Sequence, residues 1–208
     1  MFEDSPGLFL LSVAFISLSG VLMPGPVFAA TVAQGYKDKN AGLRIVLGHA
    51  LVEVPLIVLI FFGFDYIFED EGMFAIVAAI GGAILVWMGV GMVRAREVMV
   101  CEGVGPTRSA FLDGVITTIT NPYWLMWWAT VGAALVATAV TFGLVMLPIF
   151  AAVHLGCDAG WEYFISNTVN RTKGLWNVKW HHLLILASGV LMLVFGLYFL
   201  VSSIAVLL

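Results

Sequence analysis

Long apolar stretches separated by short charged ones limit what this sequence can fold into. A helix needs roughly 20 residues to cross a ~30 Å hydrocarbon core. Six stretches reach that length, at residues 8–34, 43–64, 73–93, 110–137, 141–165 and 182–207. None of them shows the alternation of a β-barrel strand, which spans the membrane in about 10 residues. We therefore expect an all-α membrane protein with six transmembrane helices.

The composition leads to the same fold class. Of the 208 residues, 62% are hydrophobic and 11% are charged, whereas a soluble domain is nearer half apolar and a quarter charged. This excludes a disordered chain, a nucleic-acid-binding domain and a disulfide-rich secreted module. No loop is long enough for a separate soluble domain. We expect one membrane domain over residues 1–208, surrounded by the lipid bilayer, and not an enzyme.

The basic residues fix the expected orientation. In the six-helix arrangement all nine fall on one side of the membrane: Lys37, Lys39, Arg44, Arg94, Arg96, Arg108, Arg171, Lys173 and Lys179. The other side has no lysine or arginine, and it carries the acidic residues at positions 3, 4, 65 and 69–71. Loops rich in lysine and arginine stay in the cytoplasm. Both termini are therefore expected outside.

Three helices followed by three helices predict an inverted repeat. Because each half has an odd number of spans, the halves enter the membrane from opposite faces, as in many secondary transporters. The repeats would cover residues 8–93 and 110–207, joined by a cytoplasmic linker at residues 94–109. Features of the first and second spans return in the fourth and fifth.

The first of these features is a break in the helix. Pro24, Gly25 and Pro26 interrupt the first span, and Asn121 and Pro122 interrupt the fourth. A proline inside a helix removes a hydrogen-bond donor, and unpaired backbone is tolerated at membrane depth only where it meets protein or lines a wet cavity. A broken helix presents a positively polarised N-terminus. These residues are candidates for binding a substrate carboxylate, although a plain kink is the simpler interpretation of either break alone.

The second feature is a histidine four residues before a carboxylate. His49 precedes Glu53 in the second span, and His154 precedes Asp158 in the fifth. This spacing places both side chains on one helix face. A charge inside the membrane costs at least ~2.5–3.5 kcal/mol and usually marks an ion, proton or substrate path. The alternative is a structural polar cluster with neutral carboxyl groups.

Four aromatic residues follow the break in the fourth span: Tyr123, Trp124, Trp127 and Trp128. Aromatic residues usually gather at the membrane interfaces, whereas these lie near the middle of a span. Packing is the simpler interpretation of this group. The functional interpretation is a cavity wall, or a cation–π surface for an ammonium group.

Several motifs resemble the lysine exporter (LysE/RhtB) family of amino-acid efflux proteins, in the LysE superfamily. They are Pro24-Gly25-Pro26, Leu47-Gly48-His49 after Gly42, Asn121-Pro122, and Asp158-Ala159-Gly160-Trp161. The resemblance implies export of amino acids or related solutes, driven by the proton gradient, across the plasma membrane of a prokaryote. The histidine before each carboxylate departs from the family pattern.

We therefore expect a proton-coupled exporter of an amino acid or similar zwitterion, without a cofactor. Backbone N–H groups at the two breaks would hold the substrate carboxylate. Glu53 or Asp158 would hold the ammonium group and exchange it for a proton. His49 and His154 would tune these carboxylates or relay the proton.

Two alternatives remain open at the level of the sequence. Two imidazoles and two carboxylates also suit Mn, Fe, Ni or Zn, so His49, Glu53, His154 and Asp158 could serve a divalent metal-ion exporter of the same superfamily. A membrane subunit or scaffold without transport activity is the other. Gly81-Gly82 and Gly89-x-Gly91 in the third span allow close helix packing, within the chain or in a homo-oligomer.

Overall fold

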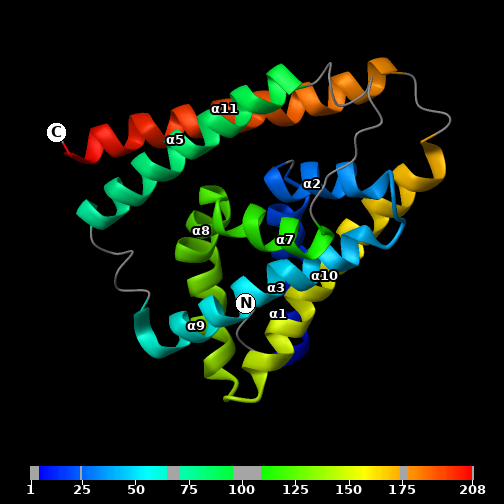
Figure 1. Cartoon of the computed structure of the whole chain (residues 1–208). Helices are drawn as coiled ribbons and strands as arrows, with labels where there is room; N and C mark the ends of the chain where they lie inside the picture. The colour runs from blue at the N-terminus through cyan, green and yellow to red at the C-terminus, as the bar shows by residue number, and fades with distance from the viewer. Residues whose placement is uncertain (1–4, 24, 65–70, 96–108, 174–177, 208) are drawn as a thin grey trace.

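The computed structural model describes residues 5–23, 25–64, 71–95, 109–173 and 178–207. Every regular element in this part of the chain is helical (Figure 1), which confirms the all-α fold class there. Pro24, the linker residues 96–108 and the acidic residues at positions 3, 4, 65, 69 and 70 lie outside the described residues.

The first half of the chain contains a sharply bent helix pair. Helices α1 (Pro6–Val21) and α2 (Pro26–Gly35) meet at 78°, so the predicted first span is divided at the proline-rich break. Helix α3 (Ala41–Leu59) continues into the π-helical turn η1 (Ile60–Phe64). Gly63 in η1 has φ 84°, a backbone conformation that favours glycine. The half closes with α5 (Glu71–Ala95).

The second half is also interrupted. Its elements are α7 (Ala110–Ile119), α8 (Pro122–Trp127), η2 (Trp128–Gly132), α9 (Ala133–Thr141), α10 (Met146–Thr172) and α11 (Val178–Leu207). The turn between the fourth and fifth predicted spans lies at residues 142–145, a few residues beyond its expected position. Gly143 in this turn has φ 98°, and only glycine adopts such an angle without strain.

Several helices have the length and composition of membrane spans. Among the described residues, Ala41–Gly63 and Tyr123–Thr141 are long and apolar enough to cross a membrane, and the bent α1–α2 pair makes a third if it is one span. Helices α10 and α11 have 27 and 30 residues, which correspond to about 40 and 45 Å at 1.5 Å per residue. The count of six spans and the inverted repeat remain predictions.

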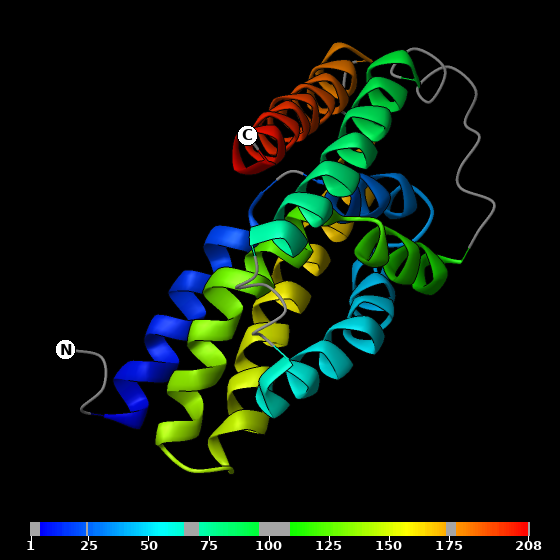
Figure 2. The ribbon, with the colours of Figure 1, turned by 90° about the vertical axis from the view of Figure 1, so that its left-hand side faces the viewer.

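Helix α10 is the centre of the packing. It contacts α1, α2, α3 and α9, and Figure 2 shows α1, α9 and α10 as neighbouring rods. Helix α3 packs in turn against α7 at an unusually close distance. A Cβ atom on Gly48 would collide with the Phe111 carbonyl oxygen, and one on Gly114 would collide with the Ile45 carbonyl oxygen. The two helix backbones therefore touch directly.

Helices α5 and α11 form an antiparallel pair of their own (Figures 1 and 2). A Cβ on Gly82 would lie 2.7 Å from the Gly196 carbonyl oxygen, and one on Gly89 would lie 2.8 Å from that of Gly189. Of the glycines predicted to allow close packing, Gly82 and Gly89 thus serve a contact within the chain, whereas nothing lies within 4 Å of a Cβ on Gly91. Helix α5 also contacts α8, which joins the pair to the remaining helices.

The contact between α3 and α7 predicts a position-specific effect of alanine. Gly114→Ala should lower the free energy of unfolding by about 1–3 kcal/mol, because the added methyl group overpacks the interface. Gly156→Ala is the matched control, since nothing lies within 4 Å of its added Cβ. Replacing a glycine by alanine in a helix interior should raise the free energy of unfolding by up to about 1 kcal/mol. Thermal unfolding of the detergent-purified protein measures both, and equal melting temperatures would contradict the close contact.

Candidate functional site

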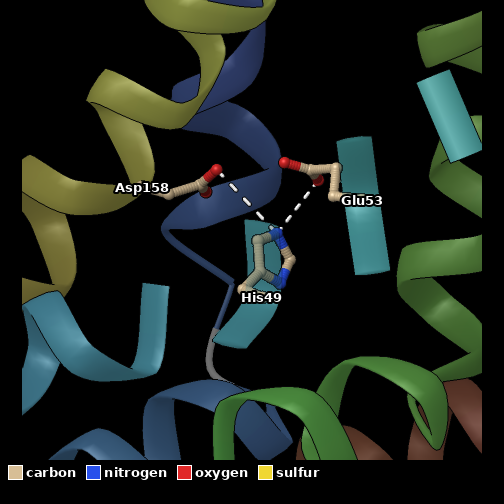
Figure 3. A group of neighbouring side chains, drawn as sticks. All are labelled: His49, Glu53 and Asp158. Carbon is tan, nitrogen blue, oxygen red and sulfur yellow. Dashed lines mark hydrogen bonds and ion pairs between the residues drawn. The ribbon is translucent and has the colours of Figure 1, made fainter. Parts of the chain in front are cut away.

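Four buried side chains meet between α3 and α10, and we call them the four-residue cluster: His49, Glu53, His154 and Asp158. His49 Nε2 lies 2.9 Å from Glu53 Oε1 and 3.9 Å from Asp158 Oδ2. His154 Nε2 lies 3.4 Å from Glu53 Oε1 and 3.6 Å from Asp158 Oδ2. Figure 3 shows His49 between the two carboxylates. The sequence placed each pair on one helix face, and the fold brings the two pairs together.

Glu53 is fully buried and accepts several hydrogen bonds through one oxygen. Its Oε1 atom accepts from Trp124 Nε1 at 3.0 Å and from Trp128 Nε1 at 2.9 Å, and it lies 2.9 Å from His49 Nε2. Hydrogen bonds to an ionised group are the stronger ones. Two of the aromatic residues after the break thus do more than pack, because their indole N–H groups hold this carboxylate.

The other ring nitrogen of each histidine meets a hydroxyl group from the opposite half of the chain. His49 Nδ1 lies 2.7 Å from Thr118 Oγ1 on α7, and His154 Nδ1 lies 2.7 Å from Ser17 Oγ on α1. Thr118 also donates its hydroxyl hydrogen to the Gly114 carbonyl oxygen at 2.7 Å. Sequence reasoning missed both hydroxyl groups, because their partners lie 69 and 137 residues away.

Helix α10 continues the polar row beyond the cluster. Its buried face carries His154, Asp158, Glu162 and Ser166 at intervals of four residues. Glu162 was missed from the sequence, although the same i,i+4 spacing could have found it. Glu162 Oε2, Asp158 Oδ2 and Glu53 Oε2 are buried and have no hydrogen-bond partner among the described residues. Buried polar atoms are rarely left unpaired, so this row has unused capacity for a positively charged ligand.

The end of α10 holds the connection between α2 and α3. Three side chains donate to carbonyl oxygens of this connection: Ser166 Oγ to Lys39 at 2.8 Å, Asn170 Nδ2 to Gly35 at 2.9 Å, and Lys173 Nζ to Tyr36 at 2.9 Å. The polar face of α10 therefore runs from the four-residue cluster to the helix end that contacts the α2–α3 connection.

A cavity of about 90 Å³ adjoins the cluster and brings the two helix breaks together. Gly25, Pro26 and Asn121 line it, whereas Pro24 lies outside the described residues. A Cβ on Gly25 would lie 4.0 Å from Asn121 Nδ2. Asn121 Oδ1 caps α8 by accepting from Trp124 N at 3.4 Å, and Pro122 is the first residue of that helix.

The charges around the cavity are mainly acidic. Its described lining includes Glu53, Asp158 and Glu162, together with both histidines of the cluster, but neither lysine nor arginine. Tyr123, Trp124, Trp127 and Trp128 also line it. The four aromatic residues thus form part of the cavity wall and also pack in or against the hydrophobic core, so the structure bears out both interpretations.

Comparisons with known proteins identify the family of this chain. A sequence model of the family described as LysE type translocator matches residues 18–203. The chain belongs to this family. A Bacillus subtilis (strain 168) protein named "Putative amino acid efflux protein YcgF" is 24% identical over 195 residues, which cover 91% of this chain and 93% of the relative. No solved structure matches the chain significantly. Family and helices together make this LysE-type chain a multi-pass membrane transporter.

The indole bonds to Glu53 predict a measurable contribution to stability. Trp128→Phe should destabilise the protein by about 1.5–3 kcal/mol, the usual contribution of a hydrogen bond to a charged group. Trp161→Phe is the control, because Trp161 Nε1 is buried and has no hydrogen-bond partner in the described part of the chain. Loss of this N–H group should be neutral or stabilising. A double-mutant cycle of Trp128→Phe with Glu53→Met, which removes the acceptor at similar volume, separates the bond from the lost volume. A coupling energy of zero would contradict the bond.

Proposed function

We propose that this LysE-type translocator exports amino acids or related small zwitterions by proton antiport. The plasma membrane, with both termini outside, is the proposed setting. The observation that carries the proposal is one cavity lined both by residues of the two helix breaks and by carboxylates whose oxygens include some with no hydrogen-bond partner among the described residues. The name of the Bacillus subtilis relative supports an amino acid as the substrate.

The substrate ammonium group would bind at the carboxylates. Asp158 Oδ2 is the preferred partner, because it is buried and has no hydrogen-bond donor among the described residues. Glu53 Oε1 already accepts from two indole N–H groups and lies 2.9 Å from His49 Nε2, which leaves Glu53 Oε2 as a second contact. A buried charge is stable only when it is paired and hydrogen-bonded, so an ammonium group fits this place.

The substrate carboxylate would bind at the opposite end of the cavity. Helix α2 begins at Pro26, after Gly25, and both residues line the cavity. The first N–H groups of a helix have no partner within the helix, and its positive dipole end favours an anion. Asn121 adds a side-chain N–H donor next to Gly25. A zwitterion would thus lie between the helix breaks and the four-residue cluster.

Proton coupling follows from competition for the same carboxylates. A proton and an ammonium group cannot both neutralise Asp158 or Glu53, so binding one releases the other. His49 and His154 contact both carboxylates through Nε2, and imidazole is the side chain best suited to pass a proton near neutral pH. Glu162, which also lines the cavity, extends the proposed path along α10.

The inverted repeat belongs to the same proposal. Ser17 and Thr118 lie on the first helix of each predicted half, and each contacts the histidine of the other half at 2.7 Å. This reciprocal pattern is what a pseudo-two-fold axis would produce. Six spans would complete the two repeats.

The coupling proposal predicts the behaviour of the two carboxylate variants. Glu53→Gln and Asp158→Asn should each abolish pH-gradient-driven efflux, because neither amide can exchange a proton for an ammonium group. A screen for amino acids that raise the melting temperature first identifies a substrate. Efflux of that radiolabelled amino acid from proteoliposomes then measures the loss of transport in each variant. Thermal unfolding verifies that the variants fold.

Asp113→Asn is the matched control for these two variants. Asp113 is a carboxylate on α7 that accepts from Gln34 Nε2 at 2.6 Å and does not line the cavity. Its efflux should resemble that of the unaltered protein. Undiminished gradient-driven efflux in Glu53→Gln would remove Glu53 from the coupling step.

The carboxylate end of the cavity predicts an effect on substrate binding. Asn121→Ser keeps an N-cap oxygen for α8 and removes the amide donor. It should raise the KM for efflux roughly tenfold or more, since a hydrogen bond to a charged group contributes about 1.5–3 kcal/mol. The maximal rate should change little. An unchanged KM would place the substrate carboxylate elsewhere.

A further inference from the structure

We propose that the four-residue cluster binds one divalent transition-metal ion of the Zn²⁺ class, and that this ion blocks transport. His49, His154, Glu53 and Asp158 would each supply one ligand atom. The inference concerns binding at the cluster and does not rest on which solute the protein exports.

The distances within the cluster suit such an ion. Zn²⁺ binds imidazole nitrogen and carboxylate oxygen at about 2.0–2.2 Å, so the ligand atoms of a tetrahedral site lie about 3.3 Å apart. The four measured separations between a histidine Nε2 and a carboxylate oxygen are 2.9, 3.9, 3.4 and 3.6 Å. In addition, ligand atoms of His49, Glu53 and Asp158 all lie within 4.8 Å of one another. His154 is not part of this group, so these three residues form the preorganised part of the site and the His154 side chain would move to supply the fourth ligand atom.

The hydrogen bonds around His49 orient it as a metal ligand. Because Thr118 donates its hydroxyl hydrogen to Gly114, its oxygen accepts from His49 Nδ1–H. In a neutral His49 with this tautomer, the Nε2 lone pair faces the carboxylates of Glu53 and Asp158. A lone pair and a carboxylate repel unless a cation lies between them. Metal-ligating histidines commonly donate the other ring N–H to an oxygen in this way.

The charge of the cluster also fits a divalent ion. Among the described residues, Asp158 Oδ2 and Glu53 Oε2 have no hydrogen-bond partner, and both residues are more than nine-tenths buried. Two carboxylates balance a charge of +2, which leaves a neutral site in surroundings where an unbalanced charge is costly.

The donor set selects the class of metal. Imidazole and carboxylate together favour Zn²⁺ and its first-row neighbours, whereas Mg²⁺ prefers oxygen ligands and retains its water. Cys157 directs its thiol to the Ala14 carbonyl oxygen at 3.8 Å and thus does not contribute to the site. The ligand set therefore contains only nitrogen and oxygen.

The test is a titration of the full-length, detergent-purified protein with ZnCl₂, followed by isothermal calorimetry and X-ray absorption. We expect one Zn²⁺ per chain, with nitrogen and oxygen neighbours at about 2.0–2.2 Å and no sulfur. MgCl₂ in excess should not compete. His154→Gln and Asp158→Asn should each lower the affinity at least tenfold.

Variants at two further positions distinguish Zn²⁺ coordination by the cluster from nonspecific attraction of Zn²⁺ to an acidic cavity. Glu162→Gln removes a carboxylate that lines the same cavity but is not a ligand, so Zn²⁺ affinity should stay within a few-fold. Thr118→Val should lower the affinity about 10–100-fold, as loss of a histidine's supporting hydrogen bond does, and Thr118→Ser should restore it. Equal losses in Glu162→Gln and Asp158→Asn, or no stoichiometric binding, would overturn the proposal.

Efflux measurements in proteoliposomes test whether Zn²⁺ bound at the cluster blocks transport. Zn²⁺ should inhibit efflux of the substrate over the concentration range in which it binds, and Mg²⁺ should not. Saturating Zn²⁺ that leaves efflux unchanged would overturn the inhibitory role. Movement of Zn²⁺ itself across the membrane would also overturn it, because the metal would then be the cargo. Failure of the amino-acid proposal would leave the calorimetric result intact, so the two proposals fail separately.

Discussion

The burial of one carboxylate constrains the rest of this structure. Glu53 is fully buried in the middle of a membrane helix, where an unpaired charge would be very costly. Its Oε1 atom accepts from indole N–H groups of α8 and η2, and the Nε2 atoms of His49 on α3 and His154 on α10 lie 2.9 and 3.4 Å away. These segments must stay close for the carboxylate to stay satisfied. The contacts of Glu53 Oε1 thus hold together helices from both halves of the chain.

Much of this arrangement could be predicted from local patterns. The apolar runs predicted helices, and the prolines at positions 26 and 122 predicted breaks that the structure shows as the beginnings of α2 and α8. The i,i+4 spacing placed His49 with Glu53 and His154 with Asp158, since helical periodicity alone determines which side chains share a face. The family follows from the same motifs. Glu162 obeys the same spacing and was available to the same reasoning.

The remaining features depend on contacts between distant segments. The indole N–H groups of Trp124 and Trp128 reach Glu53 across 71 and 75 residues, and a tryptophan in a membrane helix more often packs than donates to a carboxylate. Thr118 and Ser17 are ordinary residues in a helical sequence, and only the folded chain shows that each contacts a histidine of the other half. The turn after α9 lies beyond its expected position because Gly143 alone tolerates its backbone angle.

The direct backbone contact between α3 and α7 has a mechanical meaning. No side chain lies between Gly48, Gly114 and the facing carbonyl groups. We expect α3 and α7 to move as one body, because sliding would bring larger side chains into a contact that only glycine fits. The interruption between α7 and α8 is then a joint, with Thr118 and His49 on one side of it and both indole donors on the other. Rotation at this joint would carry Trp124 and Trp128 away from Glu53 while His49 kept its hydroxyl partner. The break in the fourth span therefore separates the contact between Thr118 and His49, which such a rotation would keep, from the indole hydrogen bonds to Glu53, which it would break.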